Sequence, residues 1–503
     1  MLSRYWLFVS KREPAAPVSC GRQSPSTSED AFDQPRTRAV IRSLLTWAVP
    51  GDRSDLGRFD GRRERQVLKA LAASGGSFAA QISFTLVALP VAKSTLGTDQ
   101  FVTYGKLSVV MLWVTTANIS TGPYLSLKIP DSLARKSEQG ALRAVSAAFA
   151  VASVVSLLIG ALFIVPGARD LVADVISADS GSLTDLAATA DAILIVALAA
   201  AAGTTVSVAE AVRLGLQERH IATLWSMAGT IGATIAVLIV SWTQPSLAAL
   251  VVAALVTPLV GRVSNAVLLW FRHHPNLRPR LHQVRFVESV QVLKTNGLFT
   301  AVQISGLLGW PVALILVSKN EAPGIAAGFY VVILLATLAG AFVSALVTPM
   351  LPALRDASAV QEVDWLRRGI KAVLGVAMSV AVGFLLLLVF GGPLIGMVFG
   401  SDAVPSLPLR VLLGTYFGIM ILEFSFYTIA LAFLSHTRLA AIILLRGAVS
   451  LLLLVLLVPD HGAVGAAVAL LVGVGLTSLW SYALMFVHLS RELRGRATSP
   501  RTL

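Results

Sequence analysis

Ionisable side chains are rare inside the long apolar stretches of this chain, and they are its first candidates for binding a charged ligand. A charged group at bilayer depth costs on the order of several kcal/mol unless it is paired or hydrated, so such positions are candidates for function by default. Three cations and one acid occupy them: Lys106, Arg262, Glu423 and Arg446. The set predicts a polar site with an excess of positive charge.

Arg446 and Glu423 lie on two successive apolar stretches joined by a short polar turn. Arg446 lies eight residues past Arg438, and Glu423 lies twelve residues before the turn at Ser435. At about 1.5 Å of rise per residue, an antiparallel helix pair brings both side chains to comparable depth. The spacing therefore predicts an ion pair. It either lines a cavity, where Arg446 meets the substrate and Glu423 is a protonatable switch, or it only packs the helices together.

The positions of the remaining candidates are compatible with more than one role. Arg262 lies ten residues before Arg272, too deep for an ordinary anchor, so it is expected to face a cavity, although its long side chain could snorkel part of the way. Lys106 lies near the outer end of its stretch and could offer a second cation there or reach the outer headgroups. Uncharged polar groups could bind ligand or join helices; they are Gln81, Gln303 and Asn118.

Composition shows what kind of fold must position these groups. Of 503 residues, 55% are hydrophobic and 13% are charged, and the mean hydropathy is +0.77. Roughly a quarter of the residues of an ordinary soluble domain are charged, so a soluble globular fold is excluded. The single cysteine, Cys20, leaves no intramolecular disulfide and no cysteine-based metal site. No glycine-rich loop with Gly-Lys-Ser/Thr is present, so ATP is not expected to be the direct energy source, and no cofactor is expected.

Apolar stretches of eighteen or more residues recur along the chain and predict an all-α integral membrane protein with twelve transmembrane helices. The predicted spans are 70–92, 101–125, 142–166, 187–208, 221–241, 247–271, 296–318, 324–348, 370–392, 408–434, 439–458 and 462–487.

The basic residues predict the orientation of these helices. Of the 40 Lys and Arg residues, 33 fall on one side, which places both termini in the cytoplasm. The same rule explains the net charge of +13, so nucleic-acid binding is not expected. The predicted parts are a disordered cytoplasmic tail (1–67), a six-helix lobe (68–271), a cytoplasmic connector (272–295), a second six-helix lobe (296–488) and a cytoplasmic tail (489–503). Residues 38–47 of the first tail could lie as a short interfacial helix.

An internal repeat relates the two predicted lobes. Residues 79–83 match residues 301–305 at an offset of 222, and Gly229 matches Gly447 at an offset of 218. Because each half has six helices, both halves share one orientation, as in parallel-repeat transporters. The repeat predicts a substrate path between the lobes and places Gln81 and Gln303 at equivalent positions facing one axis.

Several short motifs, taken in order, resemble a known family. They are Leu96-Gly97 followed by Phe101 and Tyr104-Gly105, NLRPR at 276–280, FGGPL at 390–394 and PDHGAVGAAVA at 459–469. The chain is similar over about residues 68–488 to the lipid-linked oligosaccharide flippases of bacterial polysaccharide biosynthesis. These belong to the multidrug/oligosaccharidyl-lipid/polysaccharide exporter superfamily, together with the multidrug and toxin extruders and the peptidoglycan-precursor flippases.

This resemblance implies two six-helix lobes around a central cavity, as in the multidrug extruders, and no chemical step. The expected substrate is a polyprenyl-diphosphate-linked oligosaccharide, moved from the inner to the outer leaflet by alternating access. Partners in that role are membrane lipid, glycosyltransferases and a polysaccharide polymerase. Two departures stand out. No acidic residue lies between Gly306 and Ser318, which weakens ion coupling there, and no charge lies between Ala70 and Ala92, which disfavours the peptidoglycan-precursor branch.

Two other functions compete with this expectation. An ion-gradient-driven exporter of drugs or small metabolites would favour an acidic cavity, whereas the intramembrane set holds three cations and one acid. A membrane polysaccharide polymerase or glycosyltransferase would need a large outer loop with catalytic groups, and the longest predicted outer loop, 167–186, has one Arg and no His.

Overall fold

The computed structural model describes residues 61–117, 122–177, 183–243, 246–348, 363–433, 436–479 and 487. Most of the predicted N-terminal tail, including 38–47, the C-terminal tail and Asn118 lie outside these described residues. The described residues from 61 onward belong to one compact unit, and they form helices and turns without a strand.

The N-terminal half contains six helical passages, several of them interrupted. Its elements are α2 (Gly61–Ser83), η3 (Phe84–Ala88), α3 (Leu89–Leu96), α4 (Thr98–Ala117), α5 (Gly122–Ala134), α6 (Glu138–Ile164), α7 (Pro166–Ser177), α8 (Leu183–Gly215), α9 (Arg219–Thr243), α10 (Leu247–Val251), η4 (Val252–Val256), α11 (Thr257–Leu268) and η5 (Leu269–His273). Helix α2 begins inside the stretch predicted as a disordered tail, because the polar residues from Gly61 extend the apolar helix by further turns.

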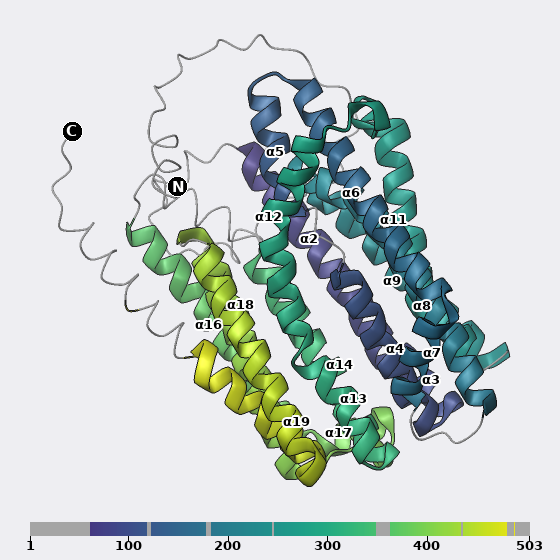
Figure 1. Cartoon of the computed structure of the whole chain (residues 1–503). Helices are drawn as coiled ribbons and strands as arrows, with labels where there is room; N and C mark the ends of the chain where they lie inside the picture. Colours follow the sequence, from purple (N-terminus) through teal and green to yellow (C-terminus); the bar gives the residue numbers. More distant parts are fainter. Residues whose placement is uncertain are drawn as a thin grey trace. The chain divides into compact units, whose positions relative to one another are not determined.

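The second half follows a connector that carries two short 3₁₀ turns, η6 (Pro275–Leu277) and η7 (Leu281–Gln283). Its elements are α12 (Phe286–Leu307), α13 (Trp310–Asn320), α14 (Pro323–Val347), α16 (Val363–Phe390), α17 (Gly392–Phe399), η8 (Ser401–Ala403), α18 (Leu407–Phe433), α19 (His436–Val474) and η9 (Gly475–Leu479). Helices α16, α18 and α19 run side by side in this half, as α6, α8, α9 and α11 do in the other (Figure 1).

Among the described residues, 9 helical segments are long and apolar enough to cross a membrane. They cover ten of the twelve predicted spans, because α19 contains the last two. Within α19 the backbone turns at Gly462, whose φ of 55° is left-handed and suits glycine, three residues after Pro459. The chain is therefore a multi-pass membrane protein.

The two other predicted spans differ from simple helices. The seventh is divided into α12 and α13, because Gly309 leaves the helical conformation and Pro311 cannot donate a backbone hydrogen bond. The second contains α4, whose apolar character is diluted by Asp99 and Lys106. Two loops are also shorter than predicted: the connector ends at Phe286, where α12 begins, and the outer loop after α6 contains α7.

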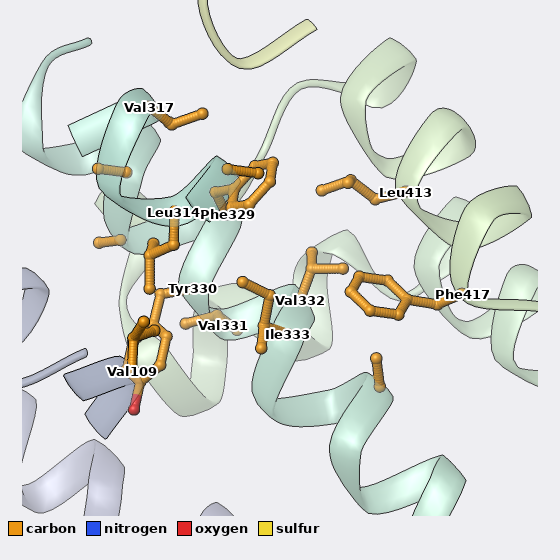
Figure 2. Close-up of a cluster of buried hydrophobic side chains, with 14 of the residues drawn as sticks. Val109, Leu314, Val317, Phe329, Tyr330, Val331, Val332, Ile333, Leu413 and Phe417 are labelled. Atoms are coloured by element: carbon orange, nitrogen blue, oxygen red, sulfur yellow. The ribbon is translucent and has the colours of Figure 1, made fainter. Parts of the chain in front are cut away.

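Helix α14 joins the two halves because it is apolar on all sides. Phe329, Val331 and Val332 are fully buried. Figure 2 shows Tyr330 beside Val109 of α4, while Leu413 and Phe417 of α18 approach the other side of α14. The Tyr330 ring also lies 5.4 Å, centroid to centroid, from that of Phe101 in α4. The N-terminal part of α12 makes a second junction, since Asn296 Oδ1 accepts a hydrogen bond from the Tyr124 amide at 3.2 Å.

Candidate functional site

The predicted ion pair between Arg446 and Glu423 is confirmed. Arg446 Nη1 of α19 donates to Glu423 Oε2 of α18, and the same nitrogen lies 3.6 Å from the sulfur of Met420. The side chains are 11% and 6% exposed, respectively. A pair buried to this degree is sensitive to the loss of either partner, because the charge left behind has no solvent to compensate it.

Close packing of α12 against α19 holds Arg446 in place. A Cβ atom at Gly447, the residue after Arg446, would lie 2.6 Å from the backbone oxygen of Ser305 on α12, so only glycine allows this approach. The Ser305 hydroxyl in turn donates to the Ile443 carbonyl, one turn before Arg446. The small residues at this contact therefore set the position of the guanidinium relative to α12.

Arg446 lines a cavity of about 230 Å³. Its walls come from α12, α13, α18 and α19 of the second half, and from α4 of the first half through Leu112. The polar and aromatic lining residues include Arg446, Gln303, Ser305, Ser450, Trp310 and Tyr416. The cavity is thus built mainly by the second half, and it borders the first half at Leu112.

Arg446 pairs with only one of the two carboxylate oxygens of Glu423. Its Oε2 accepts from Arg446, but its buried Oε1 has no hydrogen-bond partner among the described residues. An unpaired buried carboxylate oxygen costs free energy, so Glu423 Oε1 is a position at which a further hydrogen-bond donor or a cation is stabilised.

The other predicted site residues lie elsewhere. Arg262 of α11 makes a two-pronged ion pair with Glu210 of α8, with distances of 2.6 Å (Nε–Oε1) and 3.0 Å (Nη2–Oε2). Their side chains are 30% and 32% exposed, and neither lines the cavity. Lys106 does not line the cavity: it is 7% exposed, and its ammonium donates to the Ile176 carbonyl near the end of α7.

The two repeat-related glutamines also differ. Gln303 lines the cavity, whereas Gln81 is half-buried on α2 and does not. Asn118 lies outside the described residues. Of the residues singled out from the sequence, the structure brings together Arg446, Glu423 and Gln303.

A polar junction at the outer ends of the halves was not predicted. Lys93 Nζ at the end of α3 donates to both oxygens of Asp402 in η8, at 2.7 and 2.8 Å, and the Thr98 hydroxyl donates to Asp402 at 2.6 Å. Partial burial raises the pKa of Asp402, but the hydrogen bonds from Lys93 and Thr98 outweigh it and hold the pKa below its usual range. The only indication in the sequence was that Lys93 and Asp402 carry opposite charges and lie in loops predicted on the same side.

A buried arginine inside the first half was also missed. Arg213 is fully buried; its Nε donates to Asn265 Oδ1 at 2.5 Å and its Nη1 to Glu218 at 2.8 Å. Its Nη2 lies 3.1 Å from His273, a residue expected in a solvated loop. The sequence prediction ended this span at 208, whereas α8 continues to Gly215. Among the described residues, no group of three or more His, Cys, Asp or Glu side chains could hold a metal ion.

Comparison with known proteins shows the fold. No protein-family model matches the chain, and no curated protein matches it. Among solved structures, it is similar to a multidrug resistance MATE-family transporter of the MOP superfamily in the inward-facing conformation (TM-score 0.62, 12% identity, covering 84% of this chain and 96% of that one). An outward-facing MATE-family transporter is equally similar (TM-score 0.63, 12% identity, covering 87% and 97%).

A third similar structure is a MOP-superfamily transporter from Pyrococcus furiosus, described as having a binding pocket of reversed polarity that suggests a different function (TM-score 0.60, 11% identity, covering 87% and 97%). The similarity extends over nearly the whole length of each neighbour and is the same for both conformations. The chain therefore has the fold of the MATE transporters, with twelve membrane passages in two six-helix lobes.

Proposed function

We propose that the protein is a flippase that moves a polyprenyl-diphosphate-linked oligosaccharide from the inner to the outer leaflet by alternating access. The observation that carries the proposal is Arg446, a buried cation that lines a cavity bordered by both lobes. A guanidinium binds phosphate oxygens through charge-assisted hydrogen bonds, about twice as strong as neutral ones. A diphosphate crossing the hydrocarbon region needs such a partner, because it leaves its water behind.

The size of the cavity suits only the charged part of such a substrate in this conformation. Its volume of about 230 Å³ lies below the ~300–1,000 Å³ typical of pockets that enclose drug-sized ligands. The sugars therefore require the lobes to separate, while the polyprenyl chain stays in lipid. Gln303 and Ser450, which also line the cavity, offer uncharged hydrogen bonds to phosphate or sugar hydroxyls.

In this proposal Glu423 competes with the substrate for Arg446. The carboxylate holds the guanidinium when no substrate is bound, and an anionic group in the cavity takes over part of that contact. Release is favoured because Glu423 then pairs with Arg446 again.

One observation favours a second candidate, an ion-gradient-driven exporter of drugs or small metabolites. The unpartnered Oε1 of Glu423 would also attract a cationic compound, and two of the structural neighbours are multidrug transporters. The P. furiosus neighbour is described by the reversed polarity of its pocket. The experiment must therefore determine whether the pocket binds an anionic or a cationic substrate.

In the flippase role the protein would lie in the bacterial inner membrane with both termini cytoplasmic. Glycosyltransferases that complete the lipid-linked saccharide would act before it, and a polysaccharide polymerase that consumes the flipped product would act after it. In this role the protein needs no cofactor and is not an enzyme.

The test is translocation in proteoliposomes of a fluorescent polyprenyl-diphosphate saccharide, followed by quenching of the label in the outer leaflet. Arg446→Gln should lower the rate about 10- to 100-fold, the loss of one charged hydrogen bond. Arg262→Gln is the matched control and should transport at close to the wild-type rate. The flippase proposal would be wrong, and the exporter favoured, if the folded wild type did not translocate the diphosphate lipid but exported a cationic dye. In that case Glu423→Gln should inhibit the dye export.

A further inference from the structure

The connector between the lobes exposes large apolar side chains beside arginines. Phe271 is 63% exposed, Leu281 is 80% exposed, Phe286 is 82% exposed and Val287 is 70% exposed. These residues lie within one short segment, from η5 through η7 to the first turn of α12. Apolar groups of this size are not stable in bulk water at such density, so the segment is expected to contact something apolar.

The same segment carries an uncompensated positive charge. Arg272, Arg278, Arg280 and Arg285 are all exposed, and no Asp or Glu occurs between 272 and 287. Within the described part of the chain, no carboxylate forms an ion pair with any of them. The Arg278 guanidinium lies 4.6 Å from the centre of the Phe271 ring, so a cationic and an apolar side chain of the connector are in contact.

Contacts with α6 fix the level of this segment relative to the membrane. The Arg280 amide donates to Ser146 Oγ of α6 at 3.0 Å, and Leu277 is buried beside it. Ser146 lies three residues after Arg143, the last charged residue before the apolar run of α6. That separation is about 4.5 Å of helix rise, so the connector backbone lies at the boundary between headgroups and hydrocarbon.

We propose that this connector surface, residues 271–287, is a binding site for anionic phospholipid headgroups of the cytoplasmic leaflet. Phe271, Leu281 and Phe286 would enter the interface, and the arginines would bind the phosphates above them. The occupant follows from charge complementarity, since no carboxylate in the described part of the chain pairs with these arginines and the lipid phosphate supplies a negative partner. The proposal does not depend on the transported substrate. Because the connector leads into α12, bound lipid would also hold the start of that helix at the membrane surface.

The first test measures binding of phosphatidylglycerol to the full-length protein by native mass spectrometry, with phosphatidylcholine as the zwitterionic reference. The double variant Arg280→Gln/Arg285→Gln should weaken phosphatidylglycerol binding about 30-fold, the fold change expected for two basic residues at an anionic surface. The charge-matched control is Arg135→Gln/Arg367→Gln, which removes two exposed cations from the same side outside the connector. Equal loss in both variants, or equal binding of the two lipids by the wild type, would overturn the proposal.

The second test measures depth and does not require a charge change. In a Cys20→Ser background, a spin label at Phe286→Cys in vesicles of phosphatidylglycerol and phosphatidylcholine should be relaxed mainly by oxygen, which concentrates in the bilayer. A label at Arg135→Cys, whose native side chain is 71% exposed, should be relaxed mainly by a water-soluble nickel chelate. Nickel access at Phe286→Cys equal to that at Arg135→Cys would show a solvated surface and refute lipid binding.

Discussion

The two lobes each contain an intramembrane Arg–Glu pair, and the pairs differ in what surrounds them. Arg446 and Glu423 are 11% and 6% exposed and adjoin the cavity. Arg262 and Glu210 are 30% and 32% exposed and lie within the first lobe, away from that cavity. In the first lobe both carboxylate oxygens are satisfied by the guanidinium, whereas in the second lobe Glu423 Oε1 is left without a partner among the described residues.

This difference distinguishes an ion pair that can bind a ligand from an ion pair that only joins helices. Both oxygens of Glu210 are already paired with Arg262, and neither residue adjoins the cavity. Arg446 adjoins the cavity, so an anionic group there can compete with Glu423 for the guanidinium. The central claim is therefore that the second-lobe pair binds the substrate and the first-lobe pair does not.

The largest effect is expected when the buried pair is broken. Arg446→Leu should destabilise the protein by about 3–5 kcal/mol, because Glu423 is left as a buried, uncompensated charge. Arg446→Leu/Glu423→Leu should recover most of that stability but no transport, since the cation is still missing. Unfolding in detergent and translocation in proteoliposomes measure the two properties separately. A double variant that transports normally would reduce the pair to helix packing.

The next effect concerns how each arginine is positioned. Gly447→Ala should cost about 1–3 kcal/mol and lower transport, because the new methyl group would meet the Ser305 backbone and push Arg446 away. The comparison in the first lobe is a glycine beside its arginine, Gly203→Ala, whose methyl group would lie 3.4 Å from Arg262 Nη1. That variant should stay within about 0.5 kcal/mol of the wild type. Equal unfolding midpoints for the two alanine variants would contradict the close approach of α12 and α19.

A smaller effect is expected from the half-exposed pair. Arg262→Gln should cost about 1 kcal/mol, less than Arg446→Leu, since the pair is less buried and a glutamine amide can still donate to Glu210. Thermal unfolding of this variant beside Arg446→Leu measures the contrast directly. A loss for Arg262→Gln as large as that for Arg446→Leu would show that burial does not distinguish the two lobes.

The smallest effect is expected from the outer pair, because the Asp402 side chain is 46% exposed. The pKa of Asp402 lies below its reference value of 3.8, so the pair with Lys93 stabilises the outer junction above that pH and is lost as the pH falls through the lowered pKa. In a Cys20→Ser background, spin labels at Gln100→Cys and Ser406→Cys should report longer distances only below about pH 3.8.

Asp402→Asn should give the longer distances already at neutral pH and remove the pH dependence. A distance distribution that does not change with pH or with this substitution would mean that the pair does not hold the outer ends together.

The sequence predicted contacts between neighbouring helices better than contacts between distant ones. The pair of Arg446 and Glu423 was predictable because α18 and α19 follow each other, so helix rise alone sets their relative depth. Arg262 and Glu210 are 52 residues apart, and Lys93 and Asp402 are 309 residues apart. Helix packing decides which of many distant partners meet, and hydropathy carries no information about it.

Helix number was similarly easier to predict than helix shape. Ten of the twelve spans predicted from apolar length fall in the 9 candidate membrane segments of the described residues. Apolar length did not predict the break at Gly309, the continuation of α8 to Gly215 or the short helix α7, because caps, prolines and polar helical turns do not change the mean hydropathy of a span. The repeat indicated Gln81 and Gln303 together, and in this structure Gln303 lines the cavity while Gln81 does not.

The most direct measurement compares neutral double variants of the two pairs in the same translocation assay with a fluorescent polyprenyl-diphosphate saccharide. Arg446→Leu/Glu423→Leu should slow translocation about 10- to 100-fold, the loss of a charged hydrogen bond to phosphate, while Arg262→Leu/Glu210→Leu should stay within about twofold of the wild type. Equal rates for the two double variants, with both proteins folded, would contradict the assignment of the substrate site to Arg446.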